Sequence, residues 1–289
     1  MAKPTDKQGS SPTSRRSPTN TLNDLTAKEW LSESVSVWTQ RGLGAGHAEA
    51  AIERQHPAPF SYTDVSRIIN MLTKSGATVL DPFVGVGSTL KACALAGRNG
   101  IGFELYAHFA ALTRQRLEAE VPVEALGSTT QTIWEGDTRI LVNKLEDESI
   151  DLIVTSPPYW GILNKKPDHK VKAERLDSGL AVNYGDDPRD LANITDYESF
   201  IEELAASLSD CARALKHKGY MVLVVGDFRH KSRYYPFHAD IARALEERGL
   251  TLQAMNVLYQ RHKRVFPYGY PYAYVPNVHH QNVVVLRKL

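Results

Sequence analysis

The sequence has few cysteines and no long hydrophobic run. Only Cys93 and Cys211 occur among its 289 residues, and both lie in apolar, helix-like contexts far apart in the chain. This excludes a disulfide framework and a zinc site with cysteine spacing, and it favours two buried, reduced thiols. Because no apolar stretch has the length of a signal-peptide core or a membrane-spanning helix, we expect a soluble cytoplasmic protein with no membrane partner.

Net charge is almost absent as well. The chain carries 34 Lys and Arg against 33 Asp and Glu, a formal charge of +1. A nucleic-acid partner is therefore not indicated by overall charge, and any basic surface must be local. Residues 1–22 are polar, broken by prolines and locally basic, so we predict a disordered tail that either contacts phosphates or is a solvated leader. Residues 23–289 are predicted to form one folded domain.

From residue 78 onward, short apolar runs alternate with helical patterns, which predicts an α/β fold with a doubly wound, mostly parallel sheet. Three runs end in acids: Asp81 follows 78–80, Glu104 closes 100–104, and Asp137 comes after 132–134. Since the carboxyl ends of parallel strands meet at one edge, we expect these carboxylates to share a cleft. Each acid could instead only cap a helix, but together they favour a nucleoside-shaped cofactor.

A glycine turn follows the first of these strands. Residues 81–89, with Gly85 and Gly87, run from a strand end into a helix amino terminus, an arrangement that lets the backbone approach a nucleotide-like ligand closely. A dinucleotide fingerprint would need a third glycine where this chain has Leu90, so pyrophosphate binding is disfavoured.

The fourth strand end carries residues 155–160, Thr-Ser-Pro-Pro-Tyr-Trp. Two consecutive prolines remove two backbone donors, leaving carbonyl acceptors beside the Ser156 hydroxyl and two large aromatic rings. Such an acceptor cluster suits a flat ring that carries an amino group. The alternative is a stiff turn without a binding role.

Two long segments are predicted to contact a nucleic acid. Residues 161–195 begin with basic residues that include Lys165 and Lys166, and residues 259–277 interleave Arg261, Lys263 and Arg264 with aromatics. Basic and aromatic side chains together can bind phosphates and stack on bases. The alternatives are a disordered excursion for the first segment and a tyrosine-rich connection packed on the core for the second.

Three motifs together give the chain a specific resemblance. Residues 56–60, His-Pro-Ala-Pro-Phe, the turn at 81–89 and the Ser-Pro-Pro-Tyr loop resemble the signature set of the S-adenosylmethionine-dependent amino-methyltransferases of DNA, which modify N4 of cytosine or N6 of adenine. The resemblance covers roughly residues 25–289. It implies the seven-stranded sheet of the class I, Rossmann-like methyltransferases.

The resemblance also implies roles for individual residues. Glu104 would bind the ribose hydroxyls of S-adenosylmethionine, Asp137 its adenine amino edge, and Asp81 would lie beneath its methionine end. Ser156 and the Pro157 carbonyl would accept hydrogen bonds from the target amino group. Pro158 and Tyr159 would complete the catalytic loop, Tyr159 and Trp160 would stack on a flipped base, and no metal ion would be bound. The remaining cofactor residues would be His56, Pro57, Phe60, Phe83, Gly85, Gly87, Ser88 and Thr89.

Serine before Pro-Pro-Tyr is the form associated with N4 of cytosine, so DNA (cytosine-N4) methylation is the predicted activity. DNA is the predicted partner, and a cognate restriction endonuclease stays open as a second one. Three features depart from the pattern: the glycine turn precedes the Ser-Pro-Pro-Tyr loop, Ser88 replaces a usual threonine, and Gln281 stands where glutamate is common. The alternatives are an N6-adenine enzyme, an RNA or protein amino-methyltransferase on the same fold, and a catalytically dead nucleic-acid-binding module. The number of subunits stays open.

Overall fold

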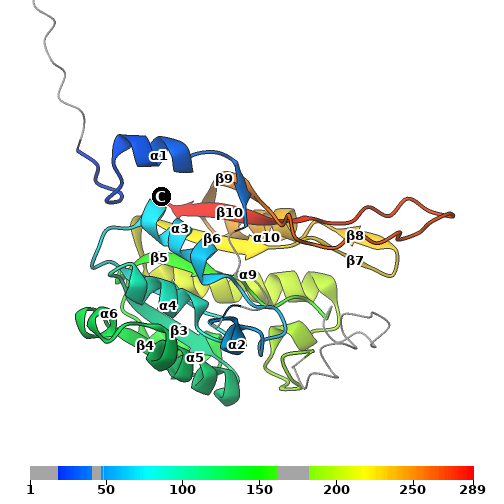
Figure 1. The fold of residues 1–289 in the computed structure, drawn as a ribbon. Coiled ribbons are helices and arrows are strands. Elements are labelled where there is room, and N and C mark those ends of the chain that lie inside the picture. Colours follow the sequence, from blue (N-terminus) through cyan, green and yellow to red (C-terminus); the bar gives the residue numbers. More distant parts are fainter. Residues whose placement is uncertain (1–18, 41–46, 48, 162–181) are drawn as a thin grey trace, which may run out of the picture.

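The computed structural model describes residues 19–40, 47, 49–161 and 182–289, and its centre is one twisted sheet (Figure 1). The sheet has eight strands in the order β1-β9-β10-β6-β5-β2-β3-β4. All neighbouring strands are parallel except β10, which runs antiparallel to both β6 and β9. The strands are β1 (Val37–Thr39), β2 (Thr78–Asp81), β3 (Asn99–Glu104), β4 (Gln131–Glu135), β5 (Ile150–Thr155), β6 (Leu215–Val225), β9 (Leu250–Tyr259) and β10 (His280–Lys288).

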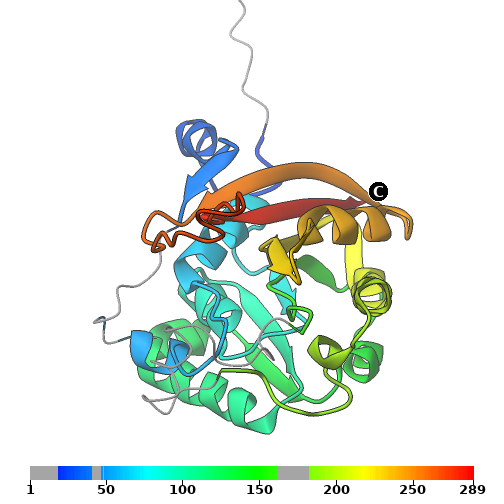
Figure 2. The same cartoon turned by 90° about the vertical axis from the view of Figure 1, so that its right-hand side faces the viewer.

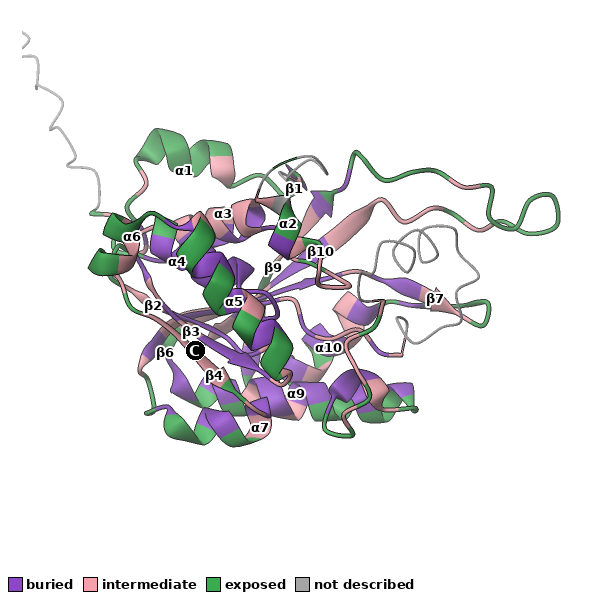
Figure 3. Ribbon diagram, turned by 60° about the horizontal axis from the view of Figure 1, so that its bottom comes forward, coloured by how far each residue is buried: buried purple, intermediate pink, exposed green. Residues whose placement is uncertain are grey.

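Helices cover both faces of the sheet (Figures 2 and 3). Buried residues alternate between two cores: Val79 packs with α3 and α4, whereas its neighbour Leu80 packs with α9 and α10. Such alternation along buried parallel strands is what a doubly wound sheet requires. The helices are α1 (Ala27–Glu33), α2 (Ala50–Glu53), α3 (Tyr62–Leu72), α4 (Ser88–Leu95), α5 (Ala107–Glu120), α6 (Val123–Ser128), α7 (Thr138–Leu141), α9 (Tyr197–Ala214) and α10 (Phe237–Glu246), with short 3-10 turns at Val142–Lys144 and Leu191–Asn193.

The predicted fold class is confirmed, but the sheet has one strand more than the seven expected. The additional strand is β1, which pairs with the edge strand β9. Its central residue Trp38 is 3% exposed, and the Arg67 guanidinium lies 4.2 Å from its ring centroid. A three-residue strand is too short for a periodic signal to separate it from a loop.

The predicted boundary between the tail and the folded domain differs from the structure. Residues 19–22 were assigned to the tail, yet Asn20 accepts hydrogen bonds from the backbone amides of Leu22 and Asn23, so order begins earlier. Further along the chain, Asp196 is the N-cap of α9 and accepts from the Ser199 amide at 2.8 Å. The rest of the predicted tail lies outside the described residues.

Both cysteines are buried and free, as expected, and burial raises the pKa of each thiol. Among the residues that the structure describes, no three His, Cys, Asp or Glu side chains form a group able to hold a metal ion. Within the same residues, no helix combines the length and the apolar character needed to cross a membrane.

Strand β2 marks the position at which the winding of the sheet reverses. It pairs with β3 on one side and with β5 on the other, and the helices that follow β2 and β5, α4 and α9, pack in the two different cores. In open α/β sheets the crevice outside the carboxyl ends of such strands is the usual ligand site. Residues 81–89 and 155–160 both follow strands that end at this crevice.

Candidate active site

The glycine turn after β2 is held by Asp81. One carboxylate oxygen accepts a hydrogen bond from the Phe83 amide at 3.0 Å, and the other accepts from the Thr89 hydroxyl. Gly85 and Gly87 adopt φ values of +55° and +80°, which residues with a side chain rarely adopt. Burial raises the pKa of Asp81 to about 6, although these hydrogen bonds oppose that effect. Asp81 therefore organises the turn from beneath.

Glu104 ends β3 and closes the opposite side of the turn. Its two carboxylate oxygens accept hydrogen bonds from the backbone amides of Gly85 and Tyr106, each at 2.9 Å. Burial raises the pKa of this carboxyl to about 8, a shift that the two amides only partly offset. Each oxygen keeps a second lone pair, so Glu104 can still accept from a ligand hydroxyl.

His56 forms the wall that faces Gly85. A Cβ atom added to Gly85 would lie 3.1 Å from His56 Nε2, so only a glycine leaves this space open. The imidazole is fixed by Phe109, with ring centroids 4.8 Å apart, and by Tyr184 at 5.4 Å. The role in cofactor binding that the resemblance implies for His56, Pro57 and Phe60 stays a prediction.

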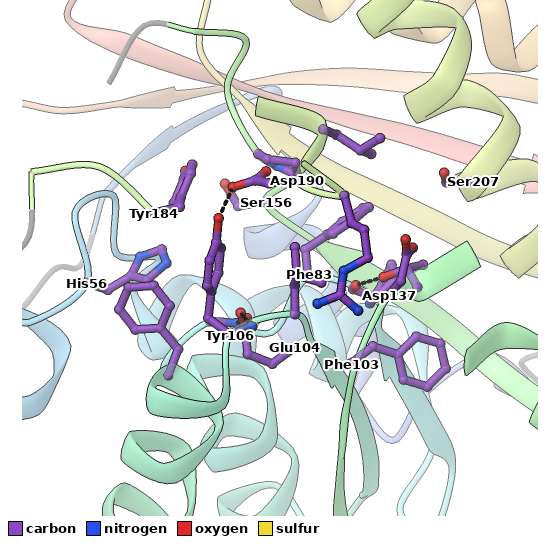
Figure 4. Close-up of a pocket in the computed structure, with 18 residues that line it drawn as sticks. His56, Phe83, Phe103, Glu104, Tyr106, Asp137, Ser156, Tyr184, Asp190 and Ser207 are labelled. Atoms are coloured by element: carbon purple, nitrogen blue, oxygen red, sulfur yellow. Dashed lines mark hydrogen bonds between the residues drawn. The ribbon is translucent and has the colours of Figure 1, made fainter. Parts of the chain in front are cut away.

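The described part of the predicted insertion, residues 182–195, lies over this cleft (Figure 4). Tyr184 stands against His56, and Asp190 accepts a hydrogen bond from the Tyr106 hydroxyl at 2.9 Å. Of the described residues in this segment, Tyr184, Arg189, Asp190 and Leu191 line the cleft, and the expected contact with DNA stays a prediction. Because Tyr184 and Asp190 reach the cleft only through the fold, no pattern in the sequence identified them.

Asp137 is the N-cap of α7 and is already partnered. Its carboxylate accepts from the Arg139 amide at 2.9 Å and forms an ion pair with the Arg139 guanidinium at 2.6 Å. Burial raises the pKa of Asp137, but the hydrogen bonds from Arg139 outweigh burial and the net shift is downward. A ligand amino group at Asp137 would therefore share this carboxylate with Arg139.

Two adjoining cavities gather most of the predicted cofactor residues. The first lies along the strand ends and is lined by Glu104, Asp137 and Asp190; the second lies under the glycine turn and is lined by Asp81. Gly87 stands outside both, since it caps α4 and packs against Thr113. The other predicted residues that line at least one of the two cavities are His56, Phe60, Phe83, Gly85, Ser88 and Thr89.

A third cavity, of about 420 Å³, opens on the other side of the Ser-Pro-Pro-Tyr loop. It is lined by Pro57 and Tyr159, and its volume is that of a small-molecule pocket. Ser156 lines all three cavities. The serine therefore stands where the two cavities lined by the predicted cofactor residues meet a separate space. Pro158 lines the first cavity, and Pro157 is buried.

Three glutamines that the sequence did not connect meet beside Tyr159. Gln281 Nε2 donates to the Tyr159 hydroxyl at 3.2 Å, and Gln260 Nε2 donates to Gln281 Oε1 at 3.4 Å and to Gln40 Oε1 at 3.2 Å. The Gly226 amide also donates to the Tyr159 hydroxyl, at 3.0 Å. Burial raises the pKa of Tyr159, while hydrogen bonds from Gln281, Gly226 and Ser156 act against it. The chain of amides fixes the tyrosine ring at the edge of the third cavity.

The remaining predicted substrate residues separate into three groups. Trp160 is 8% exposed and packs against Tyr197 and Tyr235, with ring centroids 5.3 Å away in both cases, so it is a core residue and not a free stacking surface. Lys263 lines the third cavity, and Arg261 and Arg264 are exposed nearby in sequence. Lys165 and Lys166 lie outside the described residues.

A buried network of charges supports the glycine turn from the other side. Arg116 is fully buried and donates to Ser88 Oγ at 2.9 Å, and it forms ion pairs with Glu53 and Glu120. Lys91, also buried, pairs with Glu120 at 2.7 Å. The network ties the segment before His56 to α4 and α5. Ser88, a predicted cofactor residue, takes part in this support.

Comparison with known proteins identifies related sequences. The family model described as DNA methylase, for the N6 and N4 enzymes, matches residues 3–115 and 150–281. The Type II methyltransferase M.MthZI of Methanothermobacter thermautotrophicus is 37% identical over 89 residues, 31% of this chain and 24% of the relative. M.Cfr9I of Citrobacter freundii, also named a Type II methyltransferase, is 26% identical over 148 residues, 50% of this chain and 42% of the relative. The chain thus spans less than half the length of either relative.

Solved structures of methyltransferases are similar over part of the chain. TTHA0409 of Thermus thermophilus, solved in complex with S-adenosyl-L-methionine, is 26% identical with a TM-score of 0.36, and 53% of each chain is covered. TrmN of Thermus thermophilus is 18% identical with a TM-score of 0.46, covering 83% of this chain and 52% of TrmN. The family-model match covers most of the chain. The chain therefore belongs to the family of S-adenosylmethionine-dependent DNA amino-methyltransferases.

Proposed function

We propose that the protein transfers a methyl group from S-adenosylmethionine to the exocyclic N4 amino group of cytosine in DNA. The position of Ser156 carries this proposal, because the residue lines the two cavities of the predicted cofactor site and the third cavity alike. A donor bound on one side and a base on the other would meet at this serine. The short Ser-Pro-Pro-Tyr loop would thus face both reactants.

The cleft fits the cofactor at several positions. Gly85 leaves open the space that a side chain would fill against His56, and Glu104 presents carboxylate lone pairs at a strand end. In the proposed complex Glu104 holds the ribose hydroxyls, Asp137 faces the adenine amino edge, and the walls of the second cavity surround the methionine part. When bound there, S-adenosylmethionine supplies an electrophilic methyl group attached to a sulfonium ion.

The catalytic loop would act on the target nitrogen. An exocyclic amino nitrogen is a poor nucleophile because its lone pair is delocalised into the ring. Two acceptors, the Ser156 hydroxyl and the Pro157 carbonyl, favour a pyramidal nitrogen and direct the lone pair toward the methyl group. Both buried thiols lie in helices α4 and α9, away from the loop, and this chemistry needs no covalent intermediate. Alignment of the reacting atoms can lower the activation barrier by about 7 kcal/mol or more.

The third cavity would hold the target base outside the duplex. Extruding a base costs a few kcal/mol, and contact with an aromatic face offsets part of that cost. Tyr159 provides this face, because its hydroxyl is tethered by Gln281 and the Gly226 amide while its ring borders the cavity. Gln260 and Gln281 line the same cavity. Their amide side chains are suited to hydrogen bonding with base edges.

A long exposed arm, residues 260–279, supports DNA as the polymer substrate. It connects β9 to β10 and projects away from the sheet (Figure 1). Tyr270, Tyr272 and Tyr274 are 81%, 95% and 88% exposed. Exposed tyrosines on the same arm as Arg261 and Arg264 are suited to a nucleic acid, since the cations attract phosphates and the rings can stack on bases. The alternative of a connection packed on the core disagrees with this exposure.

Two questions of specificity belong to the same proposal. Cytosine is preferred over adenine because serine precedes Pro-Pro-Tyr, whereas the acceptor geometry alone serves either amino group. The names of M.MthZI and M.Cfr9I as Type II methyltransferases support a setting with a restriction endonuclease that cuts the same DNA sequence.

A comparison of methyl acceptors tests the proposal. Duplex DNA, single-stranded DNA, tRNA and a protein mixture are incubated separately with the protein and radiolabelled S-adenosylmethionine. We expect label in DNA only. Label in RNA or protein would show that the substrate is RNA or protein instead of DNA. DNA binding without transfer to any acceptor would favour the non-catalytic module.

A further inference from the structure

A second projection from the domain is the hairpin formed by β7 (Phe228–His230) and β8 (Arg233–Tyr235). Its strands pair in antiparallel register, and Lys231 and Ser232 form the tip with φ values of +47° and +68°. These left-handed conformations suit a tight hairpin turn but are uncommon for residues with side chains. In Figures 1 and 3 the hairpin and the 260–279 arm project from the same end of the domain.

The hairpin is attached firmly to the active-site loop. Phe228 and Tyr235 stack with centroids 5.4 Å apart, and Trp160 of the Ser-Pro-Pro-Tyr-Trp sequence packs on both rings. At its base, Asp227 accepts from the Tyr234 hydroxyl at 2.8 Å and lies 2.6 Å from His238 Nδ1. The direction of the hairpin is therefore fixed relative to Ser156. This also gives Trp160 a structural role in place of the predicted stacking role.

Both projections rise from the rim of the third cavity. Asp227 and Phe228 at the base of the hairpin line that cavity, and so do Gln260 and Lys263 at the base of the 260–279 arm. A duplex positioned to insert a base into the cavity would extend past its rim. The hairpin and the arm are the segments placed to meet the backbone on either side of the extruded base.

Their charge matches such a partner. Residues 228–235 contain Arg229, Lys231 and Arg233 and no acid, and residues 260–279 contain three Lys or Arg and no acid. The whole chain has a net charge of only +1, so positive charge is concentrated on the two projections. Lys231 and Arg233 are exposed, so both cations are accessible to phosphates.

We propose that the β7–β8 hairpin is a DNA-binding arm, which contacts the phosphate backbone through Lys231 and Arg233 on the side of the third cavity away from the 260–279 arm. This rests on the proposed function, since the partner is the DNA substrate. The contact is electrostatic and independent of base sequence, and it would hold the duplex while the target base enters the cavity.

The test measures how DNA affinity depends on salt. Each phosphate contact adds about 0.9 to the slope of log Kd against log salt concentration. We expect the double variant K231Q/R233Q to have a slope smaller than wild type by about 1.8, and K231Q alone by about 0.9. The control K28Q/K74Q removes two exposed lysines, in α1 and before the amino end of β2, and keeps the wild-type slope.

The outcomes separate the hairpin from the proposed function. Arg233 lies over the Tyr235 ring at 4.9 Å, so the single variant K231Q guards against a loss of folding in the double variant. Cofactor affinity, measured by calorimetry, should equal that of wild type in every variant. Wild-type slopes in both hairpin variants would overturn the hairpin proposal and leave DNA methylation intact. If the wild-type protein itself does not bind DNA, both proposals fail together.

Discussion

The raised pKa of Glu104 leads to a prediction about cofactor binding and pH. Ribose hydroxyls donate hydrogen bonds, and an ionised carboxylate accepts them more strongly than a neutral one. Burial raises the pKa of Glu104 to about 8, so the ligand-free protein holds this group mostly neutral at pH 6. Binding of the cofactor would therefore favour loss of the proton, and affinity should increase with pH up to about 8.

The magnitude follows from the fraction of Glu104 that is ionised. With a pKa of about 8, this fraction is about 1% at pH 6 and one half at pH 8, a ratio of about 50. Replacement by glutamine keeps the shape of the side chain and removes the titration. The ratio of the variant's Kd to the wild-type Kd should thus grow by up to about 50-fold between pH 6 and pH 8.

Isothermal titration calorimetry with S-adenosylmethionine at half-unit pH steps measures both proteins under the same conditions. Titration of the cofactor's own groups cancels in the ratio of the two dissociation constants. A constant ratio across this range would refute the placement of Glu104 at the ribose or its raised pKa. Proton release, measured in buffers of different ionisation enthalpy, separates the two, since binding at the ribose releases a proton only if Glu104 is neutral beforehand.

The raised pKa of Glu104 also affects the stability of the protein, which should decrease with pH whereas cofactor affinity increases. The folded-state pKa of Glu104 is raised above its unfolded value, so the unfolded chain gives up its proton at lower pH than the folded protein. The free energy of unfolding of the ligand-free protein should therefore fall as pH rises from about 4.5 to 8, by at most about 1.4 kcal/mol per pH unit from this group. Urea denaturation of wild type and E104Q at pH 5 and pH 8 measures the difference.

Three further variants test other parts of the site. Ser156→Ala should lower single-turnover methylation by about 100-fold, as loss of one transition-state hydrogen bond does elsewhere, with cofactor affinity within about twofold of wild type; unchanged turnover would exclude the serine. Gly85→Ala should weaken cofactor binding at least about tenfold, whereas Gly76→Ala, with a similar positive φ and open space around it, should only reduce stability by about 1–2 kcal/mol. Gln281→Leu removes the amide that holds the Tyr159 hydroxyl and should raise the KM for DNA by about fivefold, from a lost bond of about 1 kcal/mol; an unchanged KM would show that the tether is dispensable.

The parts of the site that depend on local sequence were predictable. Gly85 and Gly87 need positive φ, and Asp81 and Glu104 end apolar runs, so the turn and its flanking acids were recognisable from spacing alone. Topology then placed them together, because the carboxyl ends of parallel strands share an edge.

Features assembled from distant segments were not predictable. Gln40, Gln260 and Gln281 come from three separate regions, and none has a periodic neighbour that marks it as part of a cavity. Tyr184 reaches His56 only because residues 182–195 fold back over the strand ends.

Aromatic residues illustrate a second limit of sequence patterns. Trp160 and Tyr159 are adjacent in a loop that resembles a base-stacking motif, and both were expected to face the base. Tyr159 borders the third cavity, whereas Trp160 is buried against the β7–β8 hairpin. Since a large ring gains free energy from either kind of contact, only the packing of the whole domain decides between them.

The measurement that tests the central claim most directly is identification of the methylated nucleoside. Duplex DNA with many different sequences is incubated with deuterated-methyl S-adenosylmethionine and either wild-type protein or the S156A variant, then digested to nucleosides and examined by mass spectrometry. We predict labelled N4-methylcytosine with wild type and a strongly reduced signal with S156A. Labelled N6-methyladenine would contradict the assignment of cytosine, and equal labelling by both proteins would contradict the role of Ser156.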